Sequence, residues 1–131
     1  MKRVILESPY AARNGRTIDD NIAYARWCAR DCVNRGESIH ASHLLYTQFL
    51  DDSKPEEREL GIKAGLAWLP VADYSVYYTD HDWSSGMLAA LHEHSIKRGF
   101  DFRIRALFGP AKLPATLHEE IEHVLRSKIE Q

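Results

Sequence analysis

Residues 74–87 read YSVYYTDHDWSSGM, an apolar run that passes through a short polar turn into the start of a helix. The first seven residues are rich in aromatic and β-branched side chains and predict a buried strand. Ser84 or Ser85 is suited to cap the helix that follows, which Gly99 ends. A strand that leads through a turn into a helix is the building unit of α/β proteins, so this stretch predicts that fold class.

The same alternation continues along the rest of the chain. Segments 3–10, 38–45 and 102–108 are further candidate strands, and helices are expected over 17–36, 55–67 and 114–129. Thr17 is suited as an N-cap, Pro55 opens a helix, and Pro9 stops a strand because it cannot donate a backbone hydrogen bond. Strand and helix alternate four times. This order predicts one α/β domain over residues 1–131, with a mainly parallel sheet of four to five strands.

Apolar spacing indicates which faces of these helices are buried. The first helix is expected to bury a stripe, and so is the last. The two stripes are Ile18, Ile22, Ala25, Ala29, Cys32 and Val33, and then Leu117, Ile121, Val124 and Leu125. Gly61 and Gly65 share one side of the second helix, which predicts close packing there against the sheet or a partner subunit.

The charge balance restricts the class of ligand. Seventeen basic and 19 acidic residues give a net charge of -2 over 131 residues, which disfavours binding to a DNA or RNA polymer. No apolar run is long enough for a membrane span or a signal peptide. Cys28 and Cys32, four apart on a helix, are expected to pack as small apolar side chains in a reducing cytoplasm. The expected partner is therefore a small molecule.

Three loops are expected to meet at one edge of the sheet. In open α/β sheets ligands bind at the carboxyl ends of the strands, near the point where strand order reverses, and a helix N-terminus there suits phosphate. The loops contain Ser8, Pro9, Tyr10, Arg13 and Asn14; Tyr46, Thr47, Gln48, Asp51 and Asp52; and Asp80, His81, Asp82, Trp83, Ser84, Ser85 and Gly86. Each also has a structural interpretation, because serine caps helices and aspartate fills turns.

Metal and serine-hydrolase sites find no support in the sequence. Seven histidines are present, but strand spacing points His40 and His43 to opposite faces, and His92 and His94 do not share a helix face. No HExxH, paired CxxC or GxSxG motif occurs. We therefore predict no metal and no cofactor.

Three motifs carry a resemblance to a known superfamily. They are VILESPYA at 4–11, HLLYTQFLDD with PEERELGIKAGLAW across 43–68, and VYYTDHDWSSGM at 76–87. With them the chain resembles the nucleoside 2-deoxyribosyltransferase-like superfamily, and within it a group of small, mostly phage-borne proteins of uncharacterised function. The resemblance implies a three-layer flavodoxin-like or Rossmann-like fold and a nucleoside or nucleotide ligand. It also implies a cytoplasmic location, which is the host cytoplasm if a phage encodes the protein.

The resemblance also implies N-glycosidic chemistry, with a Glu nucleophile four residues after the glycine of the third motif. Counting from Gly86, that position is Ala90, whose methyl group cannot attack a sugar. Glu93 lies three residues further along the helix and points in another direction, so it does not replace the missing group. Asp80 and Asp82 are better placed, and we expect them to be the catalytic carboxylates if catalysis is retained.

The resulting site prediction has two walls. Ser84, Ser85 and the Gly86 backbone are expected to bind a phosphate or ribose, opposite Ser8 and Tyr10. Arg13 and Arg58 are possible counter-charges, or solvated surface residues. The remaining expected ligand contacts are Pro9, Asn14, Tyr46, Trp83 and Met87.

Three functions remain open at this stage. The first is a nucleoside deoxyribosyltransferase or nucleotide N-glycosidase. The second is a non-catalytic phage protein that sequesters a nucleotide signal. The third is a structural module that forms homo-oligomers through the helix that contains Gly61 and Gly65.

Overall fold

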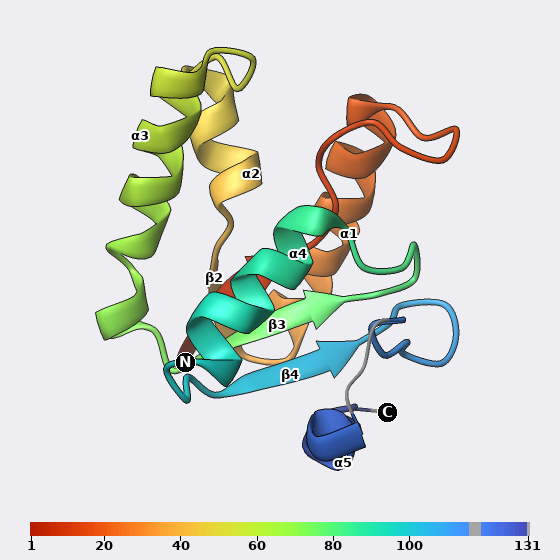
Figure 1. Cartoon of the computed structure of the whole chain (residues 1–131). Helices are drawn as coiled ribbons and strands as arrows, with labels where there is room; N and C mark the ends of the chain where they lie inside the picture. The colour runs from red at the N-terminus through yellow and green to blue at the C-terminus, as the bar shows by residue number, and fades with distance from the viewer. Residues whose placement is uncertain (116–118, 131) are drawn as a thin grey trace.

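The computed structural model describes residues 1–115 and 119–130, in which strands and helices alternate (Figure 1). The strands are β1 (Lys2–Glu7), β2 (Glu37–His40), β3 (Tyr74–Tyr78) and β4 (Phe102–Arg105). The α-helices are α1 (Ile18–Asn34), α2 (Ser42–Leu45), α3 (Pro55–Leu66), α4 (Ser85–Ala90) and α5 (Glu119–Ser127). Short 3-10 turns follow α2 and α3 at Tyr46–Gln48 and Leu69–Val71, and a π-helix, Leu91–Ile96, continues α4.

The four strands form one parallel sheet in the order β2-β1-β3-β4. The chain therefore moves outward from β1 to β2 and then crosses back to β3, so the strand order reverses between β1 and β3. The outer edge of β4 is also paired, because the Ile104 backbone bonds to Lys128 and Glu130 just after α5. The predicted parallel α/β fold is confirmed, and its strand order reverses where β1 and β3 end, the place at which open α/β sheets generally bind ligands.

Helices cover both faces of the sheet, as Figure 1 shows. Alternate residues of β3 point to opposite faces. Val76 and Tyr78 join an apolar cluster with Tyr24, Cys28 and Cys32 of α1. Tyr77 joins a second cluster with residues of the turn after β3, of α4 and the π-helix that continues it, of β4 and of α5, namely Trp83, Met87, Leu91, Phe102, Ile104 and Leu125. The sheet is thus the middle of three layers. No helix within residues 1–115 and 119–130 is long and apolar enough to cross a membrane.

The buried face of α1 differs from the predicted stripe. Thr17 does cap the helix, in a reciprocal pair of hydrogen bonds with Asp20. Ile18 and Val33, however, are 41% and 51% exposed. The face that meets the sheet runs through Asn21, Tyr24, Ala25, Cys28 and Cys32. Asn21 and Tyr24 each have a hydrogen-bonding partner inside the fold and can therefore be buried. A prediction from apolar spacing alone leaves them out.

The predicted strand over 38–45 is wrong in its second half. β2 ends at His40, and Ala41 is extended with φ -128° and ψ 102°. The carbonyl of Ala41 then accepts hydrogen bonds from the amides of Leu44 and Leu45 and starts the short helix α2. His43 is therefore on a helix, and the strand-spacing argument that separated it from His40 does not apply.

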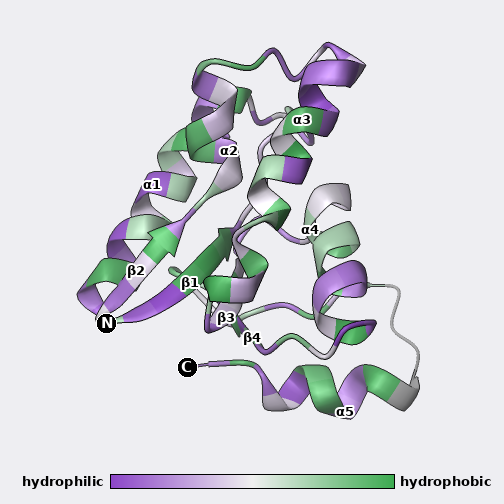
Figure 2. Cartoon of the chain, turned by 90° about the vertical axis from the view of Figure 1, so that its left-hand side faces the viewer, coloured by the Kyte–Doolittle hydropathy of each residue, from purple (hydrophilic) through white to green (hydrophobic). Residues whose placement is uncertain are grey.

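α2 and α3 stand together at the opposite end of the molecule from α5 (Figure 2). The two predicted small residues face α2 and the turn after it: a Cβ on Gly61 would lie 3.5 Å from Leu50, and one on Gly65 only 2.4 Å from the Ser42 hydroxyl. The glycines therefore allow close helix packing, but against α2 and neither the sheet nor a partner. An oligomer interface on α3 therefore cannot be formed by these two glycines.

β4 ends earlier than predicted, and the described part of α5 begins later than predicted. β4 stops at Arg105 and not at residue 108, because the amides of Leu107 and Phe108 turn towards the Asp80 carboxylate. Pro114 and Ala115 are not helical, and the described part of the final helix starts at Glu119. In that helix Leu125 is fully buried and Val124 is 38% exposed. Leu117 lies outside the described residues.

A buried ion pair joins β2 to β4 on the face of the sheet that α1 covers. The guanidinium of Arg105 donates two hydrogen bonds of 2.7 Å to the carboxylate of Glu37, and both residues are almost fully buried. Glu130 adds a third contact to Arg105 at 3.2 Å. The hydroxyl of Tyr74 also donates to Glu37. The carboxylate of Glu37 is therefore neutralised and hydrogen-bonded on several sides, as burial of a charge requires.

Candidate functional site

The loop after β1 folds into a hairpin that presents two arginines. The backbones of Arg13 and Arg16 bond to each other in both directions at 3.0 Å. Between them Asn14 and Gly15 have φ of 53° and 77°, the pair of positive values that Asn-Gly favours in a two-residue turn. The predicted turn is confirmed. As a consequence, Arg13 and Arg16 lie side by side on the backbone in the loop that follows β1.

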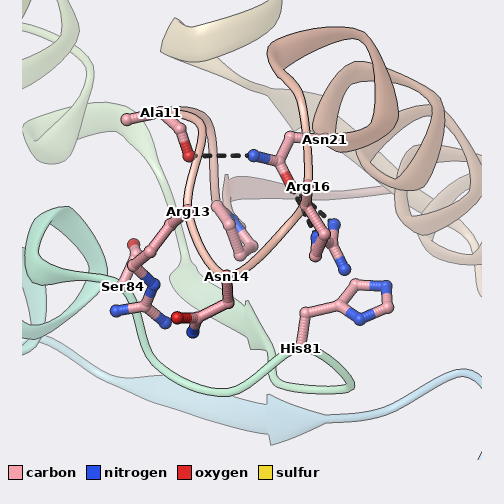
Figure 3. Close-up of a pocket in the computed structure, with 8 residues that line it drawn as sticks. Ala11, Arg13, Asn14, Arg16, Asn21, His81 and Ser84 are labelled. Carbon is pink, nitrogen blue, oxygen red and sulfur yellow. Dashed lines mark hydrogen bonds between the residues drawn. The ribbon is translucent and has the colours of Figure 1, made fainter.

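The side chain of Asn21 in α1 holds this loop in place. Its side chain is 1% exposed, and its amide nitrogen donates to the carbonyls of Tyr10 and Ala11 at 2.9 and 3.0 Å. Its oxygen accepts from the guanidinium of Arg16, 3.1 Å from Nε. One buried amide therefore holds both the backbone of the loop and one of its two cations in place (Figure 3).

The first hollow lies between this loop and the turn after β3 (Figure 3). It is lined by Pro9, Ala11, Arg13, Asn14, Arg16, Asn21, His81 and Ser84 and encloses about 20 Å³. Arg13 donates to the carbonyl of Trp83 at 3.2 Å, which joins the two loops. Neither arginine forms an ion pair with a carboxylate in the described part of the chain.

His81 completes this cationic wall without adding a charge at neutral pH. Burial lowers the pKa of its imidazole, and the charges of Arg16 and Lys112 lower it further, against the opposing charge of Asp80. The ring packs edge-on against Tyr24. The first hollow thus combines two unpaired guanidinium groups with neutral hydrogen-bonding groups, a composition suited to an anion.

Asp80, one of the two predicted catalytic carboxylates, binds three donors inside the protein. It accepts hydrogen bonds from the Tyr24 hydroxyl, from the Leu107 amide at 2.8 Å and from the Phe108 amide at 2.8 Å. Although burial acts to raise the pKa of Asp80, these hydrogen bonds lower it below its ordinary value. The carboxylate is ionised and ties the end of β3 to α1 and to the loop after β4.

Asp82, the second predicted carboxylate, is exposed at the tip of the turn. Its backbone is left-handed, with φ 69°, a conformation that Asp tolerates better than most residues. One carboxylate oxygen accepts from the Trp83 amide at 2.9 Å. The other carboxylate oxygen accepts no hydrogen bond from the described residues, so this side chain is open to solvent.

The remaining residues of the turn divide into core and surface. Trp83 is buried, stacks on Tyr77 and donates to the Lys112 carbonyl at 2.7 Å, and Met87 is 1% exposed. Ser84 caps α4 through the Met87 amide at 3.2 Å and also lines the first hollow. Ser85 and Gly86 are exposed and line neither hollow.

A second hollow of about 270 Å³ opens on the other side of the loop, between α1 and α2. Its lining is Tyr10, Ile22, Arg26, His43, Leu44, Thr47 and Gln48. The ring of His43 shares a hydrogen bond of 2.7 Å with the hydroxyl of Ser8, and burial lowers the pKa of His43 to about 4. The imidazole is therefore neutral, and Tyr10 faces a different hollow from Ser84.

Two predicted ligand contacts lie elsewhere. Arg58 is exposed on α3 and lines neither hollow. Tyr46 packs between His40 and Phe49, accepts a hydrogen bond from Trp68 at 3.2 Å and supports the packing of α3. Of the second predicted loop, only Thr47 and Gln48 line a hollow.

Sequence reasoning missed Arg16 and Asn21 of the first hollow, and it also missed Glu7 and His43 at the same edge of the sheet. Glu7 is the last residue of β1 and pairs in register with Tyr77. Its signal was visible, since an acidic side chain directly after the buried apolar run Val4–Leu6 of a central strand is the informative exception. His43 gave no such signal, because the contact with Ser8 depends on the unexpected helix α2.

The fold and the site define the class of protein: a Rossmann-like α/β protein with a polar site where β1 and β3 end. Residues 2–105, from β1 to β4, match the family described as Domain of unknown function (DUF7768), and the chain belongs to this family. Comparison with curated protein sequences gives no match.

A solved structure shares the fold. It is a 2-deoxyribosyltransferase from the psychrotolerant bacterium Bacillus psychrosaccharolyticus, with a TM-score of 0.58 and 15% sequence identity over 97% of this chain and 82% of that one. The resemblance to that superfamily is therefore confirmed at the level of the fold.

Proposed function

We propose that this protein binds a nucleoside 5′-phosphate at the carboxyl ends of β1 and β3 and acts on the bond between its base and its sugar. The observation that carries the proposal is the convergence of Arg13 and Arg16, without carboxylate partners, on the edge where α/β proteins bind ligands. The fold shared with a 2-deoxyribosyltransferase supports a nucleoside ligand.

The first hollow is the proposed phosphate subsite. Its volume of about 20 Å³ is close to the space of a single water, so an incoming phosphate must displace a side chain. The side chain of Arg13 is suited to move, because its only hydrogen bond to the described residues goes to the Trp83 carbonyl. Arg16 is fixed by Asn21 and would stay. Ser84 and Asn14 offer further polar groups to the anion.

Asp82 is the more accessible of the two proposed carboxylates for contact with the sugar. Asp80 is committed to Tyr24, Leu107 and Phe108, so we propose that it positions the turn and does not attack the sugar. Ser85 and Gly86 line neither hollow, so we propose that only their backbone amides contact the ligand.

Ligand binding is tested by thermal unfolding and calorimetry with dAMP, dCMP, dGMP and TMP, each beside its nucleoside and inorganic phosphate. A nucleotide at 100 times its Kd stabilises the folded state by about 2.7 kcal/mol. We expect Arg13→Gln and Arg16→Gln each to weaken nucleotide binding about 10- to 100-fold, the cost of one charged hydrogen-bonding partner, and to leave nucleoside binding unchanged. The matched control is Arg98→Gln, an exposed arginine outside both hollows. Equal loss in all three variants would reject the phosphate subsite.

Capture without turnover is the second candidate function, and Ala90 favours it. Ala90 packs its methyl group against the cluster that contains Tyr77, at the position where the resemblance places a Glu nucleophile. In a phage, such a protein would sequester a nucleotide signal of the host. The two candidates differ in what is recovered after incubation: intact nucleotide for capture, and free base or exchanged base for catalysis.

Assembly into a homo-oligomer in the cytoplasm is part of the same proposal. Exposed apolar side chains collect on α3 and the turn after it, including Leu60, Ile62, Trp68 and Val71, and an apolar surface of this kind is typical of an interface. Native mass spectrometry of the purified protein counts the subunits and detects a co-purified nucleotide in one measurement.

A further inference from the structure

Glu7 points to the α4 side of the sheet. In β1, Val4 and Leu6 belong to the cluster on the α1 side, so the alternation of a strand turns Glu7 to the other side. There it lies beside Tyr77, its partner in the register, and the charge of Glu7 helps to raise the pKa of the Tyr77 hydroxyl, after the larger effect of burial. Glu7 is the final residue of the central strand β1.

The carboxyl group of Glu7 is half-buried and unpaired. It makes no hydrogen bond or ion pair with residues 1–115 or 121–130. Glu37 is the instructive contrast, because this second strand glutamate is neutralised by Arg105. An ionised carboxyl group without such a partner destabilises the fold, and burial raises the pKa of Glu7 to about 7. Groups left in this state are typical of functional sites.

Glu7 is close along the chain to the first hollow, although its own side chain lines neither hollow. Pro9, two residues further along, lines the first hollow. Across the same face, Ala90 of α4 packs on the cluster to which Tyr77 belongs. The strand therefore carries a carboxyl group on the face where the helix offers only a methyl group.

We infer that Glu7 is the catalytic carboxylate of this site and activates water for hydrolysis of the base–sugar bond of a nucleoside 5′-phosphate. This inference rests on the proposed nucleotide site. The ionised carboxylate takes a proton from water while the water oxygen bonds to the anomeric carbon of the sugar. The bond between that carbon and the base nitrogen breaks, and its electron pair leaves with the base. The proton held by Glu7 then passes to that nitrogen, so free base and sugar phosphate are formed and Glu7 is ionised again.

The test measures free base by chromatography after incubation of the protein with dAMP, dCMP, dGMP or TMP. We expect the wild-type protein to release base, and Glu7→Gln to lower kcat at least about 100-fold, the usual contribution of a general base. Thermal stabilisation by the same nucleotide is expected to be retained in that variant. The matched control, Glu93→Gln, removes an exposed glutamate that pairs with Lys97 and is expected to react like the wild type.

A second readout separates a catalytic from a structural role. Because the pKa of Glu7 is raised above its unfolded value, ionisation of this group costs stability as pH rises through about 7. Glu7→Gln is therefore expected to gain stability over the wild type between pH 5 and pH 8 while it loses activity. Glu7→Asp keeps the acid but moves it away by one methylene, and is expected to retain partial activity.

The results distinguish failure of the role of Glu7 from failure of the proposed nucleotide site. Nucleotide binding without base release from any of the four nucleotides overturns the role of Glu7 and leaves the binding site intact. Base release by Glu7→Gln within threefold of the wild type also overturns it and favours Asp82. If no nucleotide stabilises the protein, the proposed function fails together with this inference.

Discussion

Replacement of Asp80 by Asn separates a structural role for this carboxylate from a catalytic one. The side chain accepts hydrogen bonds from the Tyr24 hydroxyl and from the amides of Leu107 and Phe108. Asparagine keeps one acceptor oxygen but turns an NH2 group towards a donor. Hydrogen bonds to a charged group contribute about 1.5–3 kcal/mol each, and an unsatisfied donor costs about 1–3 kcal/mol. Because Asp80 is half-buried, we expect a loss near the lower end, about 2–3 kcal/mol at pH 7.

The pH dependence of this loss is part of the prediction. The pKa of Asp80 is lowered in the folded protein, so its contribution to stability is present above the unfolded value of about 3.9 and disappears as pH falls through the folded value. The difference between wild type and Asp80→Asn should therefore shrink as the pH falls below about 4.

Urea unfolding at pH 7, 5 and 3 measures both effects as shifts of the midpoint at constant slope. Asp82→Asn is the matched control: the residue is exposed, accepts one hydrogen bond, and Asn tolerates its left-handed backbone. We expect that control to change stability by less than about 1 kcal/mol. A wild-type stability for Asp80→Asn at pH 7, or a deficit at pH 3 as large as that at pH 7, would refute the reasoning.

Three further substitutions test packing and charge burial by the same unfolding measurement. Gly65→Ala brings a Cβ onto the Ser42 hydroxyl, which must rotate away, whereas the Cβ of Gly61→Ala meets only contacts of 3.5 Å or more. We therefore expect Gly65→Ala to be less stable than Gly61→Ala by about 1 kcal/mol; equal effects would contradict the packing of α3 on α2. Arg105→Leu leaves the Glu37 carboxylate buried without its cation and should cost about 3–5 kcal/mol, and a loss below 1 kcal/mol would show that water or another group replaces the pair.

Much of the fold was predictable because its signals are local. Thr17 and Ser84 cap helices, Pro55 opens α3, and Asn14–Gly15 forms the turn, since each depends on residues within three or four positions. The alternation of strand and helix then gave the fold class. Strand order follows from the packing of whole elements, and the sequence contained no local signal for it.

The parts that failed depend on partners far along the chain. β4 is shorter than its apolar pattern because Asp80 captures the amides of Leu107 and Phe108. Ser42–Leu45 is helical although its residues suit a strand, and His43 meets Ser8 only in that form. Strand-end placement named Arg13, Asn14, His81 and Ser84, which the structure brings together around the first hollow. It missed Arg16 and Asn21, which help to make the first hollow.

The pairing of Ile104 with Lys128 and Glu130 closes the outer border of the sheet with the chain's own tail. A shortened protein that ends before Lys128 would leave the β4 backbone with open hydrogen-bonding groups and would remove one carboxylate from Arg105. Such a border attracts strands from other molecules. Removal of these few residues should therefore increase self-association of the protein during purification.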